Sequence, residues 1–259
     1  MKLKVITLNV WHGGRLWDEM IDFLKREDAD VLLLQEVHFA LEDSTLSRQR
    51  TYQDFQKIFD YQVYDFAGEM NWDFEGKRVS HGNAIFSKLP LLERHEPIFF
   101  EYPFNDNYIS APENYPLIPH NLEHLTLDAH GTPFDVFSFH GVWDLDGTND
   151  SPHRLKMSQA IVDAVQGLEH VVVAGDTNAQ GDCQTIRNIE EHLTNVFGDE
   201  LPTSFNLQHK DLDKFPGYAT ATVDMMFASP NLKVTEHYCP QVNVSDHLPL
   251  VAVIEVPEA

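Results

Sequence analysis

The sequence predicts an α/β fold in which two β-sheets pack face to face with helices on the outside. Two observations support this. Short apolar, β-prone runs alternate with amphipathic helical segments along the 259 residues, and the two halves share a loose plan of strands and helices. No linker, low-complexity tract or repeat of solenoid period interrupts the alternation. We therefore expect a single domain over residues 1–259.

The N-terminal part is predicted to be a strand–helix–strand unit. Residues 2–9 and 31–35 are apolar runs typical of buried strands. Between them, apolar residues at mostly helical spacing predict an amphipathic helix over residues 17–26. The short connections favour a βαβ unit. Three further elements are expected: a helix over residues 47–59 and strands over residues 61–65 and 83–87.

The second half begins with a predicted hairpin. Residues 122–127 and 134–139 alternate in polarity and flank a turn that contains Gly131 and Pro133. Ser151, as N-cap before a proline, predicts the start of a helix that runs to about residue 167. The remaining elements are expected to be a short helix over residues 185–192 and strands over residues 171–174, 222–227, 233–238 and 248–256.

Composition excludes some classes of protein. With 18 Lys+Arg against 41 Asp+Glu, the net charge of −23 disfavours a protein that grips long duplex nucleic acid. A nuclease remains open, because a bound divalent cation attracts phosphate locally. The sequence has no run of about 20 apolar residues and no secretory leader, so we expect a cytoplasmic protein without a membrane anchor. Cys183 and Cys239 are expected to be reduced thiols.

Polar residues stand at the ends of the apolar runs in the N-terminal unit. Glu36 follows a strand, where burial of a lone carboxylate is costly unless a cation compensates it. Asn9 would supply a neutral oxygen ligand or hold Glu36. Because no His/Cys cluster at ligand spacing is present, the expected metal is Mg²⁺ or Mn²⁺ rather than zinc. A capping or surface role for Glu36 is the alternative.

Asp176 and Asn178 follow the apolar run at 171–174. The alternation of a strand places both side chains on one side of the chain. We expect Asp176 to orient and activate water, and Asn178 to bind a phosphoryl oxygen or to hold Asp176. An Asx turn after a strand is the alternative.

His247 is the natural acid–base or oxyanion-stabilising group, because the pKa of histidine lies near neutrality. Asp224, an acid inside an apolar strand, would fix the tautomer of His247. His140 stands at the exit of another strand and is a second candidate for a phosphate contact. A purely structural role is the alternative for His140.

Short motifs occur along the chain in this order: Leu8-Asn9-Val10, Leu34-Gln35-Glu36, Gly82-Asn83-Ala84-Ile85-Phe86-Ser87, Gly175-Asp176-Thr177-Asn178, Val223-Asp224-Met225-Met226-Phe227 and Ser245-Asp246-His247. In type and order they resemble the endonuclease/exonuclease/phosphatase superfamily, over residues 5–250. The resemblance implies a four-layer α/β sandwich with two mostly antiparallel sheets inside and helices outside.

The resemblance also implies roles for single residues. Asn9, Glu36 and Asp246 would surround the metal. Asp176 with Asn178 would orient the attacking water and the phosphate. His247 with Asp224 would contact the scissile phosphate. His140 would also contact this phosphate. Thr177 stands where many members carry Phe and matches the tyrosyl-DNA phosphodiesterase branch, whose N-terminal motif differs from the one after Asn9.

The implied reaction is Mg²⁺-dependent hydrolysis of a phosphodiester, foremost by a nuclease acting on DNA or RNA. Arg15 and Arg154 are candidate phosphate clamps, with a surface ion pair as the alternative for each. Trp143 is a candidate substrate contact. The aromatic residues 99–120 would form a lid or pocket wall that stacks a base or lines an apolar pocket.

Other functions stay open at this stage. They are hydrolysis of a phospholipid of the sphingomyelin type, hydrolysis of a small phosphate ester, and an inactive binding module. Nothing in the sequence specifies an oligomeric state.

Overall fold

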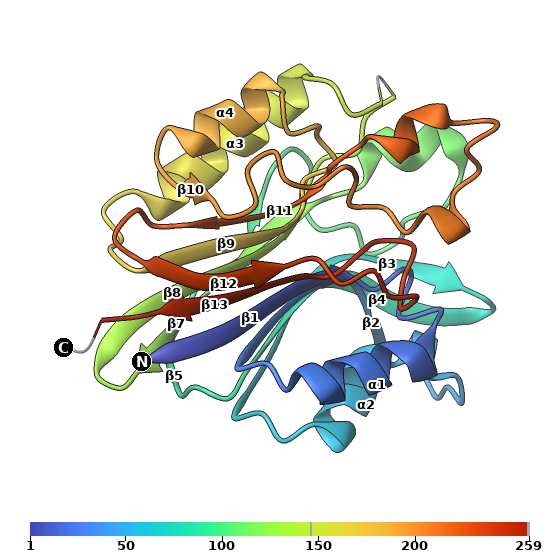
Figure 1. Ribbon diagram of the computed structural model, residues 1–259. Coiled ribbons are helices and arrows are strands. Elements are labelled where there is room, and N and C mark those ends of the chain that lie inside the picture. The colour runs from blue at the N-terminus through green and yellow to red at the C-terminus, as the bar shows by residue number, and fades with distance from the viewer. Residues whose placement is uncertain (146, 258–259) are drawn as a thin grey trace.

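The computed structural model describes residues 1–145 and 147–257, and within them the strands form two sheets of six and seven strands. Figure 1 shows the two sheets stacked in the middle of the molecule, with one pair of helices above them and another pair below. The predicted α/β sandwich is confirmed.

The first sheet has the strand order β12-β13-β1-β2-β4-β3. Its strands are β1 (Lys2–Asn9), β2 (Val31–Ala40), β3 (Val63–Phe74), β4 (Lys77–Ser87), β12 (Lys233–Tyr238) and β13 (Leu250–Glu255). β1 and β2 run parallel and the other neighbours antiparallel. The parallel pair confirms the predicted βαβ unit, since α1 lies between these two strands in the chain.

The second sheet has the order β10-β11-β9-β8-β7-β5, with β6 also paired to β7. Its strands are β5 (Leu91–Arg94), β6 (Ile98–Phe99), β7 (Asn121–Ala129), β8 (Thr132–His140), β9 (Val171–Asp176), β10 (Thr194–Asn195) and β11 (Asp224–Ala228). β8 and β9 form the parallel pair of this sheet. Both sheets are therefore mostly antiparallel.

The helices form the outer layers. They are α1 (Trp17–Glu27), α2 (Thr51–Ile58), α3 (Pro152–Val165) and α4 (Gln184–Glu190), with short 3₁₀ turns at Ser47–Gln49, Pro112–Leu117, Leu207–His209 and Pro216–Ala219. None of the helices in the described residues is long and apolar enough to cross a membrane. Figure 1 places α1 and α2 below the first sheet and α3 and α4 above the second.

Three apolar clusters hold the layers together. The central cluster joins the facing sides of the two sheets, for example through Val5 and Leu33 of the first sheet and Val136 and Val172 of the second. A second cluster lies between the first sheet and the helices α1 and α2, and a third between the second sheet and the helices α3 and α4. This burial of apolar surface is the main force that stabilises the sandwich.

The predicted elements differ from the structure mainly in length. β3 and β4 extend far beyond the predicted 61–65 and 83–87, and they meet in a turn at Glu75 and Gly76, both with positive φ. Buried polar residues such as Glu69 and His81 interrupt the apolar pattern, so the middle of these strands cannot be recognised from the sequence. The short edge strands β5, β6 and β10 were not predicted.

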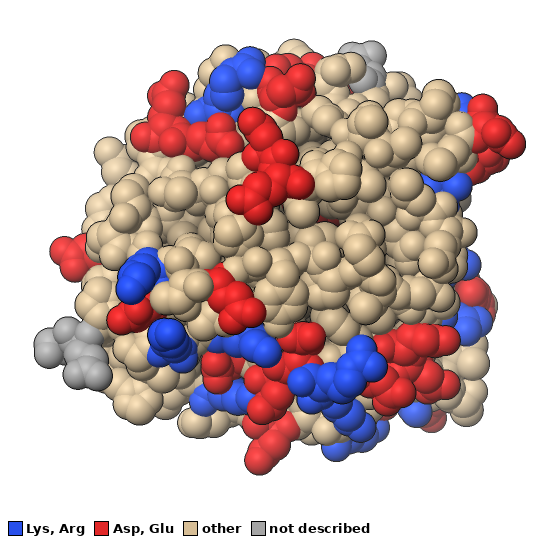
Figure 2. All heavy atoms as spheres, viewed as in Figure 1, with Lys and Arg blue, Asp and Glu red and all other residues tan. Residues whose placement is uncertain are grey.

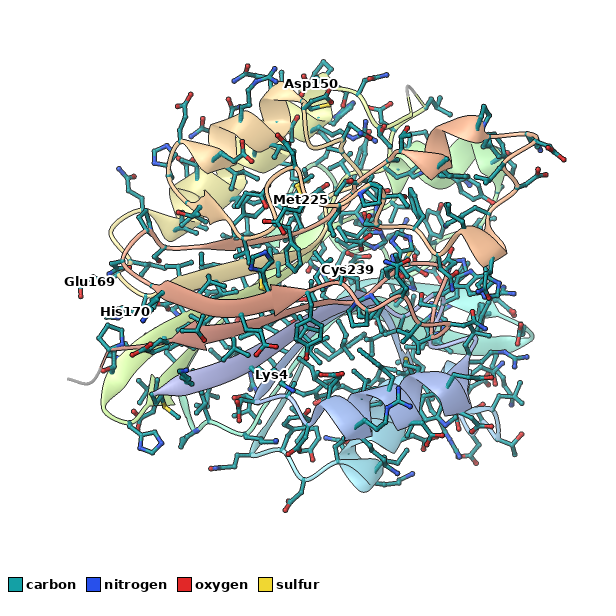
Figure 3. All side chains as sticks on the ribbon, viewed as in Figure 1. Lys4, Asp150, Glu169, His170, Met225 and Cys239 are labelled. Carbon is teal, nitrogen blue, oxygen red and sulfur yellow. The ribbon has the colours of Figure 1, made fainter. Side chains whose placement is uncertain are left out.

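Local contacts fix the helix ends. The side chain of Ser151 accepts a hydrogen bond from the backbone N of Arg154, which confirms the predicted N-cap of α3. Asp150, labelled in Figure 3, accepts hydrogen bonds from the backbone N of Gln184 and Thr185 at the start of α4. Cys183 and Cys239 are both free thiols.

Charged side chains are mixed in sign on the face shown in Figure 2. Lys and Arg are interspersed with Asp and Glu above and below a broad uncharged band, and they do not gather into one basic stripe there.

Glu123 is a carboxylate in the core between the sheets. It lies on the same face of β7 as Leu125 and Leu127, it is 2% exposed, and its two oxygens have no hydrogen-bond partner in the described part of the chain. Burial raises the pKa of Glu123 well above its usual value of 4.5, and the nearby Asp65 adds to this effect. Between pH 4.5 and the raised pKa, Glu123 is therefore protonated in the native state and ionised in the unfolded chain.

We expect Glu123→Gln to stabilise the protein above about pH 5. Between the unfolded pKa of 4.5 and the raised native pKa, the native state binds more protons, so the free energy of unfolding of the wild type falls as pH rises. The variant does not titrate and should be more stable at neutral pH by about 1 kcal/mol or more. Chemical unfolding at several pH values measures this difference. Glu93→Gln, an exposed change on β5, is the control, and parallel curves for wild type and Glu123→Gln would contradict the prediction.

Candidate active site

The register of the second sheet places three polar side chains in a row. In the parallel pair β8–β9, His140 lies opposite Asp176, and in the antiparallel pair β9–β11, Asp176 lies opposite Asp224. The row marks the edge of the sheet where β8 and β9 end and β11 begins. All three residues are buried. The predicted grouping of His140, Asp176 and Asp224 therefore follows directly from strand pairing.

The first sheet contributes Asn9 and Glu36. Asn9 ends β1 and lies opposite Gln35 of the parallel strand β2. The pairing of β2 with β4 shifts register between Leu34 and Val37, and Glu36 at this bulge has a left-handed backbone with φ of 59°. The strand was predicted to end at residue 35, but it continues to Ala40 beyond the bulge. A bulge redirects a side chain out of the regular alternation, which explains how Glu36 reaches the site.

The side-chain amide of Asn9 bridges the two sheets. Its Nδ2 donates to Glu36 Oε1 at 3.0 Å and to Asp176 Oδ2 at 3.1 Å. Its Oδ1 accepts from the backbone N of Trp11 at 3.0 Å. Of the two predicted roles for Asn9, these contacts show the one in which it holds Glu36, and they add a link to Asp176.

Glu36 is held by two groups of His12. Oε2 of Glu36 accepts from the backbone N of His12 at 2.6 Å and lies 2.9 Å from His12 Nδ1. Burial by itself raises the pKa of Glu36, but the His12 imidazole outweighs burial, and the pKa lies well below its usual value. For His12, burial lowers the pKa, and the carboxylate of Glu36 outweighs it and raises the pKa. Glu36 is therefore an ionised carboxylate at neutral pH.

Asp176 contacts several of the predicted site residues: Asn9, Asn178 and two histidines lie around its carboxylate. Its Oδ1 accepts from the backbone N of Asn178 at 2.8 Å, which is the Asx turn considered above. Its Oδ2 accepts from Asn9 and lies 3.7 Å from His140 Nε2 and 3.9 Å from His247 Nε2. Asn178 has a left-handed backbone with φ of 51° and donates Nδ2 to the carbonyl of Gly141 at 2.9 Å.

His247 pairs with Asp224, as predicted. His247 Nδ1 lies 2.8 Å from Asp224 Oδ2, which makes Nδ1 the donor and leaves Nε2 facing Asp176. Burial lowers the pKa of His247, but the carboxylates of Asp224 and Asp176 outweigh burial and raise the pKa to about 9. His247 is therefore a cation at neutral pH, and its Nε2–H is free to donate to an anion.

The residues before His247 connect the site to the rest of the fold. Ser245 donates its hydroxyl to the backbone O of Asn9 at 2.7 Å and accepts from the backbone N of His247 at 3.3 Å. Asp246 Oδ2 lies 2.7 Å from Lys210 Nζ, which also lies 4.3 Å from the ring of Phe205. Asp246 thus reaches the site edge already paired with a cation.

His140 has a second acidic neighbour, Glu69 of β3. His140 Nδ1 lies 3.9 Å from Glu69 Oε2, and Glu69 is fully buried. Burial raises the pKa of Glu69 to about 8. Burial and the neighbouring ring of His120 lower the pKa of His140. This interior acid was not predicted.

The three predicted substrate contacts have different positions. Arg15 is exposed, and its guanidinium lies 5.4 Å from the ring centroid of Trp11. Trp143 is partly buried, and its ring packs edge-on against Tyr115 of the aromatic segment at 5.8 Å. This contact orders part of the segment 99–120 beside the loop that follows β8.

Arg154 does not have the position of a phosphate clamp. It is fully buried in α3, and its guanidinium donates to three backbone carbonyls: Val142 at 3.0 Å, Gly147 at 2.6 Å, and Asn149. An arginine whose donors are used by the carbonyls of Val142, Gly147 and Asn149 holds these parts of the backbone in place. The prediction for Arg154 was wrong because the sequence does not show that this side chain is buried.

Three residues at the site lack a sequence signal that singles them out: His12, Lys210 and Glu69. Each reaches the site through a tertiary contact with a residue distant in sequence. A weak signal exists for a further residue, His81, because it stands directly before the motif that begins at Gly82.

The donor set fits a hard divalent cation. The carboxylates of Glu36 and Asp246 are oxygen ligands of the kind that Mg²⁺ and Mn²⁺ prefer. Each has a positive neighbour, His12 for Glu36 and Lys210 for Asp246. These neighbours show that positive charge is favourable beside Glu36 and Asp246, and a metal ion would supply more of it.

Comparisons with known proteins agree with this geometry. The model of the endonuclease/exonuclease/phosphatase family matches residues 6–247. No curated protein sequence matches the chain. Among solved structures, an endonuclease/exonuclease/phosphatase from Beutenbergia cavernae is similar, with 19% identity and a TM-score of 0.74, covering 98% of this chain and 72% of that one.

Two further structures are similar in fold. A mannosyl-6-phosphatase of Bacteroides thetaiotaomicron has 17% identity and a TM-score of 0.65, over 98% of this chain and 100% of that one. D. rerio TDP2, complexed with a single-stranded DNA product, has 16% identity and a TM-score of 0.68, over 98% of this chain and 99% of that one. Because the family model spans most of its length, the chain belongs to the endonuclease/exonuclease/phosphatase family, whose members are metal-dependent phosphoester hydrolases.

Proposed function

We propose that this enzyme hydrolyses a phosphodiester with the help of Mg²⁺ or Mn²⁺, and that its substrate is DNA or RNA. The observation that carries the proposal is the position of Asp176, whose Oδ2 faces the amide of Asn9 and the imidazoles of His140 and His247. A carboxylate beside a cationic histidine is the arrangement needed to activate water next to a phosphate.

The side chains have separate tasks in this mechanism. Asp176 accepts a proton from the attacking water, and Asn9 and the backbone of Asn178 hold its carboxylate in place. His247, kept protonated by Asp224, donates Nε2–H to a non-bridging phosphoryl oxygen and stabilises the developing charge. His140 contacts the same phosphate from the other side of Asp176.

Glu36 and Asp246 would hold the metal, with Asn9 and His12 fixing the orientation of Glu36. A divalent cation held there would supply positive charge that stabilises the developing negative charge. Lys210, beside Asp246, adds a further positive charge at the phosphate-binding edge.

The choice of nucleic acid is supported by aromatic rings at the rim. Trp143 packs on Tyr115, and Trp11 lies 5.0 Å from His209 by ring centroids. Such rings can stack bases of a short or single strand without a long basic track, which suits a net charge of −23. Arg15 beside Trp11 is placed to contact a backbone phosphate.

One observation favours a second candidate, a phospholipid or small phosphate-ester hydrolase. A shallow groove of about 480 Å³ is lined mainly by apolar residues, among them Phe39, Phe66, Phe99 and Phe104. Gly68 and Ser80, also in its lining, are chain neighbours of Glu69 and His81. An apolar groove would accept an acyl chain as readily as a base.

We expect Asp176→Asn to lower kcat for a phosphodiester by about 10³-fold or more, since the variant keeps the size of the side chain and loses the proton acceptor. Hydrolysis of bis-p-nitrophenyl phosphate measures the effect, and thermal melting checks the fold. Asp163→Asn, an exposed change on α3, is the matched control and should behave as wild type. Undiminished turnover by a normally melting Asp176→Asn variant would refute the assignment.

We expect chelation of divalent ions to abolish turnover and Mg²⁺ or Mn²⁺ to restore it. Glu36→Gln should raise the Mg²⁺ concentration needed for half-maximal rate by at least about 10-fold, because it removes a charged ligand. A Mg²⁺ titration of the rate gives this value, with the exposed change Glu19→Gln on α1 as the control. A variant with the metal requirement of the wild type would remove Glu36 from the metal site.

The substrate class is tested by a panel of single-stranded DNA, RNA, abasic duplex DNA, sphingomyelin, inositol phosphates and mannose 6-phosphate. We expect the highest kcat/KM on a single-stranded nucleic acid. Hydrolysis of a lipid or a sugar phosphate with no nuclease activity would favour the second candidate. Failure on every substrate, including bis-p-nitrophenyl phosphate, would indicate an inactive binding module.

A further inference from the structure

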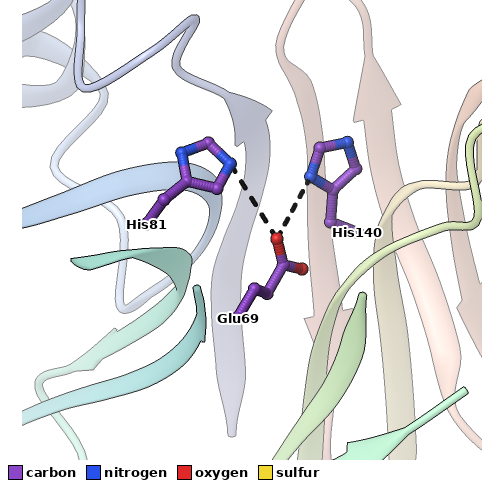
Figure 4. A group of neighbouring side chains, drawn as sticks. All are labelled: Glu69, His81 and His140. Carbon is purple, nitrogen blue, oxygen red and sulfur yellow. Dashed lines mark ion pairs between the residues drawn. The ribbon is translucent and has the colours of Figure 1, made fainter. Parts of the chain in front are cut away.

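We propose a second metal site, for Zn²⁺, formed by Glu69 of β3, His81 of β4 and His140 of β8. Figure 4 shows the carboxylate of Glu69 between the two imidazoles, which come from different sheets. Glu69 Oε2 lies 3.8 Å from His81 Nε2 and 3.9 Å from His140 Nδ1. One ligand atom from each residue falls within 4.8 Å of the other two.

The atoms that face one another lack other partners. In the described residues, Glu69 Oε2 and His140 Nδ1 have no hydrogen-bond partner. At 3.8 Å and 3.9 Å, the contacts between them and with His81 are too long for hydrogen bonds. Glu69 is 0% exposed, His81 is 3% exposed and His140 is 8% exposed, so water does not compensate these atoms freely. Buried polar atoms without partners are costly unless a ligand satisfies them.

A chain of hydrogen bonds fixes the tautomer of His81. The carbonyl of Arg48 can only accept, so His38 donates Nδ1–H to it at 2.7 Å. The neutral, fully buried ring of His38 then has a lone pair on Nε2, and His81 must donate Nδ1–H to it at 3.1 Å. The lone pair of His81 Nε2 therefore points toward Glu69 Oε2. The ionised carboxylate of Glu69 and the lone pair of His81 are two acceptors that face each other, and a cation between them would satisfy both.

The ligand set and the distances favour zinc. Two imidazoles and one carboxylate are a common set for Zn²⁺, whereas Mg²⁺ prefers oxygen. Zinc ligands at about 2.0–2.2 Å from the ion lie roughly 3.3–3.5 Å from one another in a tetrahedron. The observed separations of 3.8 Å and 3.9 Å need to close by only about half an ångström. The donated Nδ1–H of His81 is the outer hydrogen bond that zinc-bound histidines usually make.

A second cluster in the chain shows the contrast. His95, His124 and Asp135 also place ligand atoms within 4.8 Å of one another. However, His124 Nε2 bonds Asp135 Oδ1 at 2.8 Å, and His95 Nε2 bonds Thr126 at 3.1 Å. These atoms satisfy one another, so this cluster needs no ion and provides a matched control.

The zinc site shares His140 with the row of His140, Asp176 and Asp224, but it does not share the metal proposed at Glu36 and Asp246. A metal on Nδ1 of His140 would leave the proton on Nε2, the atom that faces Asp176 at 3.7 Å. Zinc would thus hold His140 in the tautomer that donates a hydrogen bond toward the phosphate. The proposal does not depend on the substrate or on the role of Glu36.

The decisive experiment is a Zn²⁺ titration of the chelator-stripped protein, followed by X-ray absorption of the zinc-loaded wild type. We expect one high-affinity Zn²⁺ per chain with two imidazoles in its shell. Glu69→Gln and His81→Gln should each bind Zn²⁺ more than about 100-fold more weakly, because loss of a direct ligand exceeds the effect of losing an outer hydrogen bond. His124→Gln, in the control cluster, and Glu36→Gln should keep wild-type Zn²⁺ affinity.

Three results would overturn the site. The first is a wild-type shell with fewer than two imidazoles, because the third cluster of this kind, Asp176, Asp224 and His247, supplies only one. This spectrum needs no variant, so a shell with fewer than two imidazoles excludes the site even if the variants fail to fold. The second is unchanged Zn²⁺ affinity in both Glu69→Gln and His81→Gln. The cluster of His95, His124 and Asp135 also supplies two imidazoles, so lowered Zn²⁺ affinity in His124→Gln would place the ion there instead. Loss of phosphodiester hydrolysis in Asp176→Asn is a separate result and bears only on the proposed function.

Discussion

The amide of Asn9 is the interaction on which the site depends. One NH₂ group donates to Glu36 in the first sheet and to Asp176 in the second, at 3.0 Å and 3.1 Å. It therefore fixes the distance between the side of the site that would hold a metal and the side that would activate water. The layers place it there, because the apolar cluster between the sheets aligns the end of β1 with the end of β9. Ser245 secures the same point by donating to the backbone O of Asn9.

Charge compensation is the second constraint. The site gathers several carboxylates in a nearly closed interior, where isolated charges are costly. Each of three acids has a positive or titratable partner: His12 for Glu36, Lys210 for Asp246 and His247 for Asp224. In Glu69 the two oxygens differ: Oε1 lies 3.4 Å from His120 Nδ1, whereas Oε2 faces His81 and His140 at distances beyond hydrogen bonding. The acids with charged side-chain partners thus differ from Glu69, whose Oε2 has no hydrogen-bond partner in the described residues.

The sequence indicated the residue types of the site well, because strand-end acids and amides interrupt apolar runs visibly. Asp176, Asp224 and His140 came together through strand register, and the pairing of His247 with Asp224 was confirmed. The sequence was less informative where burial reverses the usual meaning of a residue type. Arg154 resembles a phosphate clamp in sequence and is a buried support for a loop. Glu69 and His81 resemble surface residues of a hairpin and lie in the interior.

The sequence by itself determined the layered α/β class, the βαβ unit and the three residues of the row His140, Asp176 and Asp224, since periodicity and strand-end polarity are local properties of the chain. Only the tertiary structure decided the bulge that turns Glu36 inward, the lengths of β3 and β4, and the cations that stand beside each acid. These features depend on contacts between residues far apart in the sequence. His12 meets Glu36 when β1 pairs with β2, and Glu69 of β3 meets His140 of β8 when the two sheets pack. Lys210 and Asp246 also lie far apart in the sequence, and no local pattern encodes the distance between them.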